Sequence, residues 1–359
     1  MSDPLAKLRV QIDAIDDEIV LLLNKRAHFV QEIGEIKKNT KSHFHTPARE
    51  AAIYDRLTKN NPGPFPNQSL RHVFREIMGG SLSLEKTIRV AFLGPEATFT
   101  HQACLQQFGK SVTAISAPNI KAVFDLVEQG KTDFGIVPVE NAIEGMVGCT
   151  LDLFVDSPLL IYAEVLHEVS HCVLSKTGQR EMIRQIYSHP QAIAQCRRFL
   201  DAHFPSIPIV EMASTALAAQ RAASDDTAGV IASELAAEVY GLSVIERKIE
   251  DYPNNITRFL VISQRASEKT KHNKTSLILS IKDTPGALYE ILKPFANAGI
   301  NLMKIESRPS KKIHWEYLFY LDMEGHQDDA PCRDVIAQIK TEAVFVKGLG
   351  SYPIASQSK

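Results

Sequence analysis

The chain has 359 residues, of which 44% are hydrophobic and 23% are charged. This composition can bury large cores and argues against a disordered, collagen-like or purely coiled-coil chain. The formal net charge of −2 gives no electrostatic reason to bind nucleic acid or an anionic membrane. No apolar run approaches the length of a membrane span, and the N-terminus lacks the pattern of a signal peptide. Five scattered cysteines without a C-x-x-C pair indicate a reducing compartment, so we expect a cytoplasmic protein.

Residues 1–86 have the pattern of an all-helical domain. Apolar side chains recur in steps of three and four for about thirty residues from Leu5, which is a heptad seam. A helix with such a seam needs a partner to bury it. Two further helices are predicted, one from Pro47 to about Lys59 and one from Asn67, separated by a proline-rich breaker.

Arg26 occupies a seam position where leucine or isoleucine is usual. One interpretation is structural, with the stem packed and the guanidinium in water, or with a polar residue that fixes the register. The other is functional, because Lys37 lies about 20° around the helix and about 16 Å along it, so that two cations could clamp a small dianion. Arg9 lies about 26 Å from Arg26 along the same helix, so it can serve such a site only from an antiparallel partner chain.

Strands and helices alternate over residues 88–263, as in an α/β domain large enough for two lobes. Residues 264–274 are polar, lack periodicity and are typical of a linker. Residues 275–350 follow the β-α-β-β-α-β order of a ferredoxin-like module. Short apolar runs predict strands of the α/β domain at residues 88–93, 134–139, 159–166, 230–232 and 259–262, separated by helices such as residues 191–202 and 214–223.

Residues 1–86 resemble the all-helical chorismate mutase family. The resemblance is carried by Leu8-Arg9 with Ile12-Asp13, by Arg26, by Lys37, by Pro47 with Arg49-Glu50, and by the final helix that ends Ser81-Leu82-Ser83-Leu84-Glu85. In this family two intertwined protomers build two sites, so the resemblance implies a homodimer or a higher homo-oligomer. The residues that it implies for chorismate are Arg9, Arg26, Lys37, Arg49, Glu50, Ser81 and Glu85.

The resemblance also implies a role for each of these side chains. Arg26 and Arg9 of the partner subunit would hold the two carboxylates of chorismate, and Glu50 would accept from its hydroxyl. Lys37 and Glu85 would face the ether oxygen, where conformational restraint and stabilisation of developing charge carry the reaction. Glu85 stands where some members have an amide, and it must be protonated to donate a hydrogen bond. We therefore expect mutase activity to fall as the pH rises, and Glu85→Gln to flatten that profile.

Five motifs within residues 88–263 resemble prephenate dehydratase in identity and order. They are Gly94–Phe99, Val137–Asn141, Ser188–Gln191 with Gln195-Cys196, Ser214–Ala216 and Asn255–Phe259. The resemblance implies a two-lobed fold similar to periplasmic binding proteins, with prephenate in the cleft. Ala97 replaces a usual glycine, which indicates either an altered turn or a backbone that needs no positive φ.

In this family prephenate loses its ring carboxylate as CO2 and its hydroxyl as water. The resemblance assigns assistance of the second loss to Thr257, which we interpret as a hydrogen-bond donor because an isolated threonine is a poor acid. A relay to Thr257 through His189 or Glu140 is a further option. For Arg258 the alternative to substrate binding is a structural ion pair. The residues implied for prephenate are Glu140, Asn141, Ser188, His189, Gln195, Ser214, Thr215 and Arg258.

The segments Asp283–Tyr289 and Ile305–Pro309 resemble the signature segments of the ACT regulatory domain. A plain strand-to-helix turn at Pro285-Gly286 is the structural alternative. The resemblance implies that L-phenylalanine binds at a dimer interface and inhibits as an end product. The residues implied for this effector are Gly286, Ala287, Leu288, Glu306, Ser307, Arg308 and Pro309.

Together the three resemblances cover nearly the whole chain and predict a bifunctional chorismate mutase–prephenate dehydratase of phenylalanine biosynthesis. The expected fold class is multidomain: an all-α domain, a two-lobed α/β domain and an α+β ferredoxin-like domain. We expect no cofactor and no metal, although His43 with His45 and His167 with His171 have passable ligand spacing. A dehydratase that prefers arogenate, and a non-catalytic amino-acid sensor or solute-binding module, are the alternatives.

Overall fold

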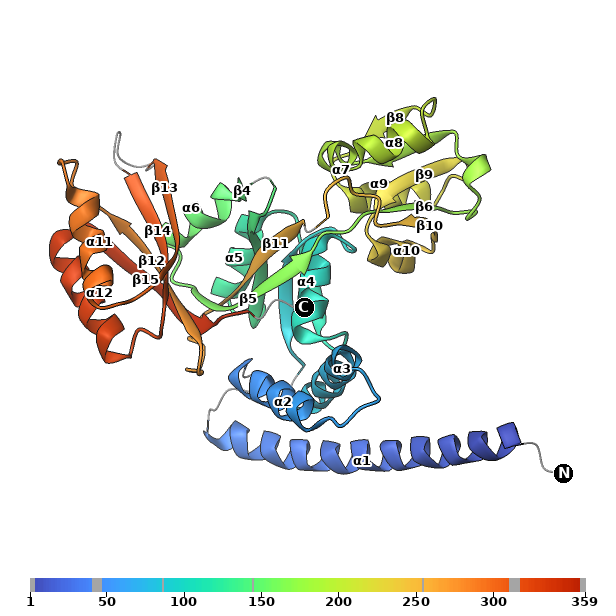
Figure 1. Ribbon diagram of the computed structural model, residues 1–359, viewed down its shortest axis with the longest axis horizontal. Coiled ribbons are helices and arrows are strands. Elements are labelled where there is room, and N and C mark those ends of the chain that lie inside the picture. Colours follow the sequence, from blue (N-terminus) through green and yellow to red (C-terminus); the bar gives the residue numbers. More distant parts are fainter. Residues whose placement is uncertain are drawn as a thin grey trace. The chain divides into compact units, whose positions relative to one another are not determined.

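The computed structural model describes residues 4–40, 47–85, 87–143, 145–253, 255–309 and 317–355, without the side chains of residues 37–40 and 47–48. Figure 1 shows the elements in chain order. The chain divides into two compact units, of which the first comprises Met1–Ile88 with Phe108–Thr113. The second comprises Arg89–Gln107 and Ala114–Lys359.

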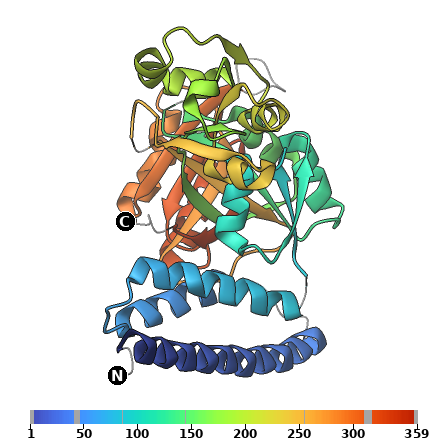
Figure 2. The same ribbon diagram turned by 90° about the vertical axis from the view of Figure 1, so that its right-hand side faces the viewer.

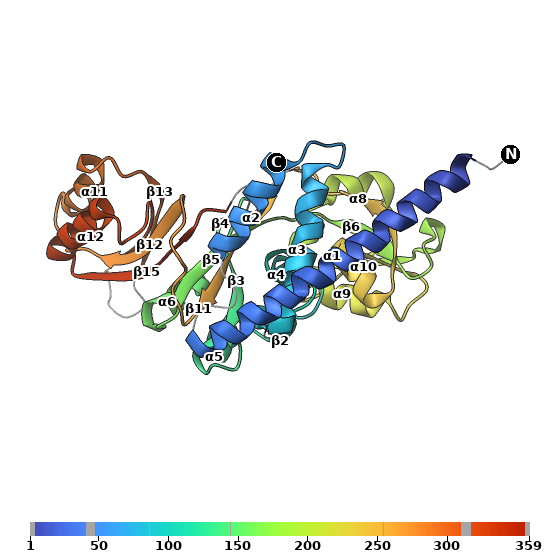
Figure 3. The same cartoon turned by 90° about the horizontal axis from the view of Figure 1, so that it is seen from below.

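The first unit contains three helices, α1 (Pro4–Thr40), α2 (Pro47–Asn60) and α3 (Asn67–Glu85). Helix α3 packs against both α1 and α2, while α1 runs as one uninterrupted rod (Figures 2 and 3). The apolar seam of α1 is exposed along its length, with Ile12 at 57% and Ile36 at 62%. A seam of this kind calls for another surface to cover it.

The second unit begins with a lobe built on one mixed sheet. Strand β11 lies between β3 and β5 and is antiparallel to both, while β1 and β3 are parallel. The strands follow the order β2 (Thr113–Ala117), β1 (Arg89–Leu93), β3 (Phe134–Asn141), β11 (Ile256–Ser263) and β5 (Leu160–Glu168), and β4 (Gly145–Met146) pairs with β3. The helices of this lobe are α4 (Phe99–Phe108), α5 (Ile120–Glu128) and α6 (Gly148–Asp156).

The second lobe is inserted between β5 and β11, so the chain crosses between the lobes twice (Figure 1). Its strands follow the order β10 (Ser243–Arg247), β6 (Cys172–Ser175), β9 (Ala228–Ala232), β7 (Gln185–Ser188) and β8 (Ile209–Glu211). Its helices are the 3-10 turn η1 (Arg180–Met182), α7 (Pro190–Gln195), α8 (Arg197–His203), α9 (Thr215–Ala222) and α10 (Glu234–Tyr240).

The remaining part of the second unit is a four-stranded antiparallel sheet with two helices. The strands follow the order β13 (Leu302–Pro309), β14 (Tyr317–Glu324), β12 (Asn273–Ser280) and β15 (Phe345–Pro353). Helices α11 (Ala287–Asn297) and α12 (Ala330–Glu342) cover one face of this sheet (Figure 3). The other face contributes side chains such as Tyr320 and Tyr352 to the core of the first lobe. Because side chains alternate along a strand, β12 is buried on both faces.

The expected fold class is confirmed, and two local expectations need correction. The helix expected over residues 191–202 is divided at Cys196, which has φ −116° and ψ 18°, into α7 and α8. Ala97 has a φ of 65°, so the interpretation that its backbone needs no positive φ is wrong. Its N–H donates to His101 Nδ1 at 3.1 Å and its carbonyl accepts from Ser233 Oγ at 3.0 Å, and these bonds hold the left-handed conformation.

Candidate active sites

The carboxyl end of β3 and the beginning of β11 carry a hydrogen-bonded group of polar side chains. Asn141 and Thr257 are cross-strand neighbours, and Asn141 Nδ2 donates to Thr257 Oγ1 at 2.8 Å. The same Nδ2 donates to Asn255 Oδ1 at 2.8 Å, and Asn255 Nδ2 donates to Gln195 Oε1 at 3.1 Å. Asn141, Asn255 and Thr257 are buried. Since Gln195 ends α7, this chain of bonds joins the two lobes through their side chains.

His171 lies on the segment that crosses from β5 to β6 and supports Gln195 from the other side. Its Nε2 lies 3.0 Å from Gln195 Oε1. Burial lowers the pKa of His171, so the ring is neutral near pH 7 and Nε2–H is the donor. Both crossings between the lobes therefore supply a donor to one amide oxygen, which fixes the orientation of Gln195.

His167 forms an uncharged wall beside Thr257, its cross-strand neighbour on β5. Its Nδ1 lies 2.7 Å from Gln106 Oε1 and its Nε2 lies 3.2 Å from Gln102 Oε1, both on α4. Burial lowers the pKa of His167 to about 4. The His167 ring beside Thr257 is thus a polar but uncharged neighbour at neutral pH.

The expected prephenate residues of the second lobe lie at strand and helix ends. Ser188 ends β7, and its Oγ donates to the carbonyl of Ile231 at 2.8 Å. His189 caps α7, accepting from the backbone N–H of Gln191. Ser214 caps α9 in the same way, and Thr215 is the first residue of that helix. The structure thus brings Asn141, Gln195 and Thr257 into one group, whereas Ser188, His189 and Ser214 form side-chain hydrogen bonds within the second lobe.

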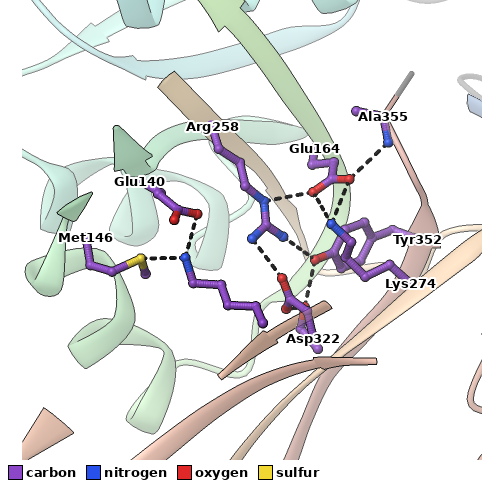
Figure 4. A network of polar contacts seen from close by, with 10 residues as sticks. Glu140, Met146, Glu164, Arg258, Lys274, Asp322, Tyr352 and Ala355 are labelled. Atoms are coloured by element: carbon purple, nitrogen blue, oxygen red, sulfur yellow. Dashed lines mark hydrogen bonds and ion pairs between the residues drawn. The ribbon is translucent and has the colours of Figure 1, made fainter. Parts of the chain in front are cut away.

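Glu140 and Arg258, the other two residues implied for prephenate, form ion pairs with the ACT-like sheet (Figure 4). Arg258 Nε lies 2.8 Å from Glu164 Oε2, and Arg258 Nη1 lies 2.7 Å from Asp322 Oδ2. Burial works to lower the pKa of Arg258, but the groups around it, Asp322 and Glu164 among them, outweigh burial and raise the pKa. These contacts are the structural ion pair that sequence analysis left open for Arg258.

In the first unit, three of the residues implied for chorismate come together where α1 meets the end of α3. Arg26 Nη1 donates to Ser81 Oγ, which donates to the carbonyl of Ile77 at 2.6 Å. Burial lowers the pKa of Arg26, and the nearby charge of Glu85 opposes that shift. A Cβ on Gly34 would lie 3.1 Å from Glu85 Cγ, so this glycine permits the close approach of the two helices.

The other residues implied for chorismate lie elsewhere in the first unit. Arg9 is exposed on α1, Arg49 is exposed at the beginning of α2, and Glu50 beside it is half-buried. Burial, with the charge of Glu50, raises the pKa of Tyr54 to about 12. The side chain of Lys37 lies outside the described residues. One chain therefore assembles Arg26, Ser81 and Glu85, with Arg9 on a distant turn of the same helix.

The residues implied for phenylalanine lie at the beginning of α11 and on β13. Gly286 has a φ of 85° and precedes α11, followed by the half-buried Ala287 and the exposed Leu288. On β13, Glu306 and Arg308 are half-buried, whereas Ser307 and Pro309 are exposed. Arg308 Nε lies 3.4 Å from Asp152 Oδ1 on α6. A Cβ on Gly148 would lie 1.9 Å from Arg308 Nη1, so Gly148 makes room for this arginine.

Within the described residues, no group of three His, Cys, Asp or Glu side chains is arranged to hold a metal ion. His43 and His45 lie outside them. In the same part of the chain, no helix is long and apolar enough to cross a membrane.

Sequence analysis named Asn255 only as the first residue of a motif, and His167 with His171 only as a pair with metal-ligand spacing, so none of the three was predicted to lie in the prephenate site. Asn255 had a usable signal, because it lies two residues before Thr257 and an extended chain places both side chains on one face. The two histidines had none: they reach the site because the lobe crossings and α4 converge there.

A helical domain, a two-lobed α/β domain with a polar group between its lobes, and an ACT-like domain in one chain define a multidomain small-molecule enzyme with a regulatory module. Family models match accordingly: chorismate mutase type II at residues 8–86, prephenate dehydratase at 90–267 and the ACT domain at 275–340.

The bifunctional chorismate mutase/prephenate dehydratase of Aquifex aeolicus is 45% identical over 357 residues, covering 98% of this chain and 99% of that protein. The enzyme of the same description from Stutzerimonas stutzeri is 43% identical over 360 residues, 99% of each chain. The structure of prephenate dehydratase from Arthrobacter aurescens in complex with L-Phe has a TM-score of 0.69 at 35% identity, covering 75% of this chain and 90% of that one. The chain belongs to the family of bifunctional chorismate mutase/prephenate dehydratases, and it has both enzyme activities.

Proposed function

We propose that this enzyme catalyses two consecutive steps of phenylalanine biosynthesis and is inhibited by L-phenylalanine. The first step rearranges chorismate to prephenate. The second removes CO2 and water from prephenate to give phenylpyruvate. The observation that carries the second step is the buried bond from Asn141 to Thr257, within a group of side chains that joins both lobes.

For the second step the protein needs to position the substrate and to donate one hydrogen bond to the departing oxygen. The bond to the ring carboxylate breaks and its electron pair enters the ring, which becomes aromatic as the C4–O bond breaks. The departing hydroxyl takes the electron pair of that bond and one proton from the solvent, and leaves as water. Thr257 Oγ accepts from Asn141, so its own O–H is oriented away from that amide and can donate to the departing oxygen. His167 and His171 are neutral near pH 7, so neither is a cationic acid for this step.

For the first step we propose a site shared between two copies of the chain. Arg26, Ser81 and Glu85 supply one side, and Arg9 of the partner subunit supplies the second carboxylate ligand. The exposed seam of α1 supports a second copy as its cover. Roles for Lys37, Arg49 and Glu50, and the pH dependence assigned to Glu85, stay predictions.

For regulation we propose that L-phenylalanine binds the ACT domain through the segments around Gly286–Leu288 and Glu306–Pro309. The support is the match to the ACT model and the relative that was solved with L-Phe. Prephenate as the second substrate and a cytoplasmic location belong to the same proposal.

The test supplies chorismate alone and follows its loss, prephenate and phenylpyruvate, with and without L-phenylalanine. We expect phenylpyruvate without added cofactor, and less of it with L-phenylalanine. Thr257→Ala should lower the dehydratase rate by about 100-fold or more while Thr257→Ser keeps most of it and mutase activity is unchanged in both. Accumulation of prephenate by the wild-type enzyme would contradict the proposed second step. If the enzyme then converts added arogenate, arogenate and not prephenate is the second substrate.

A further inference from the structure

The active-site strands present two pairs of side chains to opposite faces of the sheet. On β3 and β11, Asn141 pairs with Thr257 and Glu140 pairs with Arg258 in the strand register. Consecutive residues of a strand point to opposite faces. The first pair makes the hydrogen bond near the lobe crossings, and the second pair faces the ACT sheet.

The ACT sheet carries a second pair of oppositely charged side chains that faces Glu140 and Arg258. Lys304 of β13 and Asp322 of β14 are themselves cross-strand partners. Lys304 Nζ lies 2.5 Å from Glu140 Oε2, and Asp322 Oδ2 lies 2.7 Å from Arg258 Nη1. Each charge of one pair thus meets its opposite in the other. We name Glu140, Arg258, Lys304 and Asp322 the interdomain quartet. Figure 4 labels Glu140, Arg258 and Asp322 of this quartet.

Three of the four side chains of the quartet are largely withdrawn from water: Arg258 is 11% exposed, Asp322 10% and Lys304 16%. The side chain of Glu140, at the edge of the quartet, is 37% exposed. Glu164 and Lys274 extend the cluster, with their closest atoms 3.0 Å apart, so three carboxylates face three cations. Buried ion pairs contribute little net stability, but removing one partner leaves an uncompensated charge. Such a cluster therefore fixes one register between the two sheets.

The strand that carries Lys304 also carries an effector segment. Glu306 lies between Lys304, which pairs with Glu140, and Arg308, which pairs with Asp152 of α6. Lys304 Nζ also lies 2.8 Å from Met146 Sδ on β4. Strand β13 thus forms ion pairs with the first lobe on both sides of Glu306. Because Glu140 belongs to β3, a shift of β13 would also move β3.

We propose that Lys304 and Asp322 of the ACT domain are positioning residues for the dehydratase reaction, which hold Glu140 and Arg258 and thereby set the placement of Asn141 against Thr257. The regulatory half of this inference rests on the proposed binding of L-phenylalanine. An effector that binds better when β13 is displaced moves the quartet and lowers the population of the productive strand arrangement.

The test compares Lys304→Met, Lys304→Arg and, as a matched control, Lys340→Met on the exposed face of α12. We measure dehydratase kcat and KM, inhibition at saturating L-phenylalanine, and L-phenylalanine binding by calorimetry, with mutase activity as an internal measure of active protein. For Lys304→Met we expect kcat to fall about fivefold or more with KM within about twofold of wild type. L-phenylalanine should bind more tightly than to wild type, because β13 is already released, and its inhibition should be largely lost. Lys304→Arg and Lys340→Met should behave as wild type.

Asp322→Asn is the second variant, because it removes a charge without changing shape and addresses the other half of the quartet. It should reproduce the loss of kcat and of inhibition. If both variants keep the wild-type kcat and the wild-type inhibition, the inference is overturned. If wild type neither binds L-phenylalanine nor is inhibited by it, the proposed regulation fails, while the effect of Lys304→Met on kcat still decides the positioning role.

Discussion

At the scale of single residues, Asn255 connects the groups that the dehydratase reaction needs in place. It accepts from Asn141 and donates to Gln195, so one amide ties the first lobe to the second. We expect Asn255→Ala to lower dehydratase kcat about tenfold and to cost about 1–3 kcal/mol of stability, because buried partners lose their bonds.

The control for Asn255 is the same substitution at Asn119, whose side chain caps α5 in the first lobe. Its loss should cost about 1 kcal/mol without a change in kcat. Steady-state rates and urea unfolding of both variants separate the two effects. Equal loss of kcat in both would mean that Asn255 acts through stability alone.

His167 makes the stability of the enzyme depend on pH. Its folded pKa of about 4 lies below its ordinary value of 6.5, so between these two pH values the unfolded chain binds the proton more strongly. The stability that the neutral His167 contributes is present above pH 6.5 and is lost as the pH falls toward 4, to a total of about 3–4 kcal/mol. We expect urea unfolding at about pH 7, 5.5 and 4.5 to show this loss of stability, and we expect His167→Gln to lose less over the same range. Parallel pH profiles for the two proteins would contradict the assignment to His167.

At the scale of elements, periodicity predicted the helices of the first unit and the order of elements after residue 274, but not strands of the α/β domain such as β2, β6 and β10. The steps of three and four residues in α1, and the β-α-β-β-α-β order after residue 274, depend on local patterns and tertiary packing preserved them. The break at Cys196 was not predictable in this way, because the apolar pattern continues through it.

The sequence predicted which residues lie near the site, but not which face of the sheet each side chain occupies. Family motifs supplied both Asn141 with Thr257 and Glu140 with Arg258, yet adjacent residues of a strand face opposite sides, so the two pairs belong to different surfaces. Alternation alone could have shown this. Which face meets the cleft and which meets the ACT sheet depends on packing between domains, which one sequence does not display.

The contact between α1 and α3 gives a prediction at this scale. Glycine inside a helix costs about 1 kcal/mol relative to alanine, and Gly34 lies where the Glu85 side chain packs closely against α1. We expect Gly34→Ala to stabilise α1 locally but to push the end of α3 outward by a few tenths of an ångström, lowering mutase kcat/KM about tenfold. Dehydratase activity should not change. A stabilised variant with full mutase activity would show that this approach does not set the site.

At the scale of the whole molecule, the exposed seam of α1 and the position of Arg9 lead to one arrangement. Arg9 is about 26 Å along α1 from Arg26, further than one small substrate extends. Apolar side chains such as Ile15 and Ile19 are exposed on the turns between them. A second copy of the chain would cover these side chains and bring its own Arg9 to the first copy's Arg26, because a two-fold axis exchanges the two ends.

Subunit complementation tests this arrangement directly. Arg9→Ala and Arg26→Ala should each lose most mutase activity, since each removes a carboxylate ligand from both sites of the dimer. Co-expressed, they form mixed dimers in which one site carries both changes and the other carries neither. Random pairing should therefore restore about a quarter of wild-type mutase activity. Arg26→Ala with Glu85→Ala is the matched control: both residues come from one chain, so every site keeps one defect. Recovery in the first mixture alone requires a shared site, whereas no recovery in either places the whole mutase site within one chain.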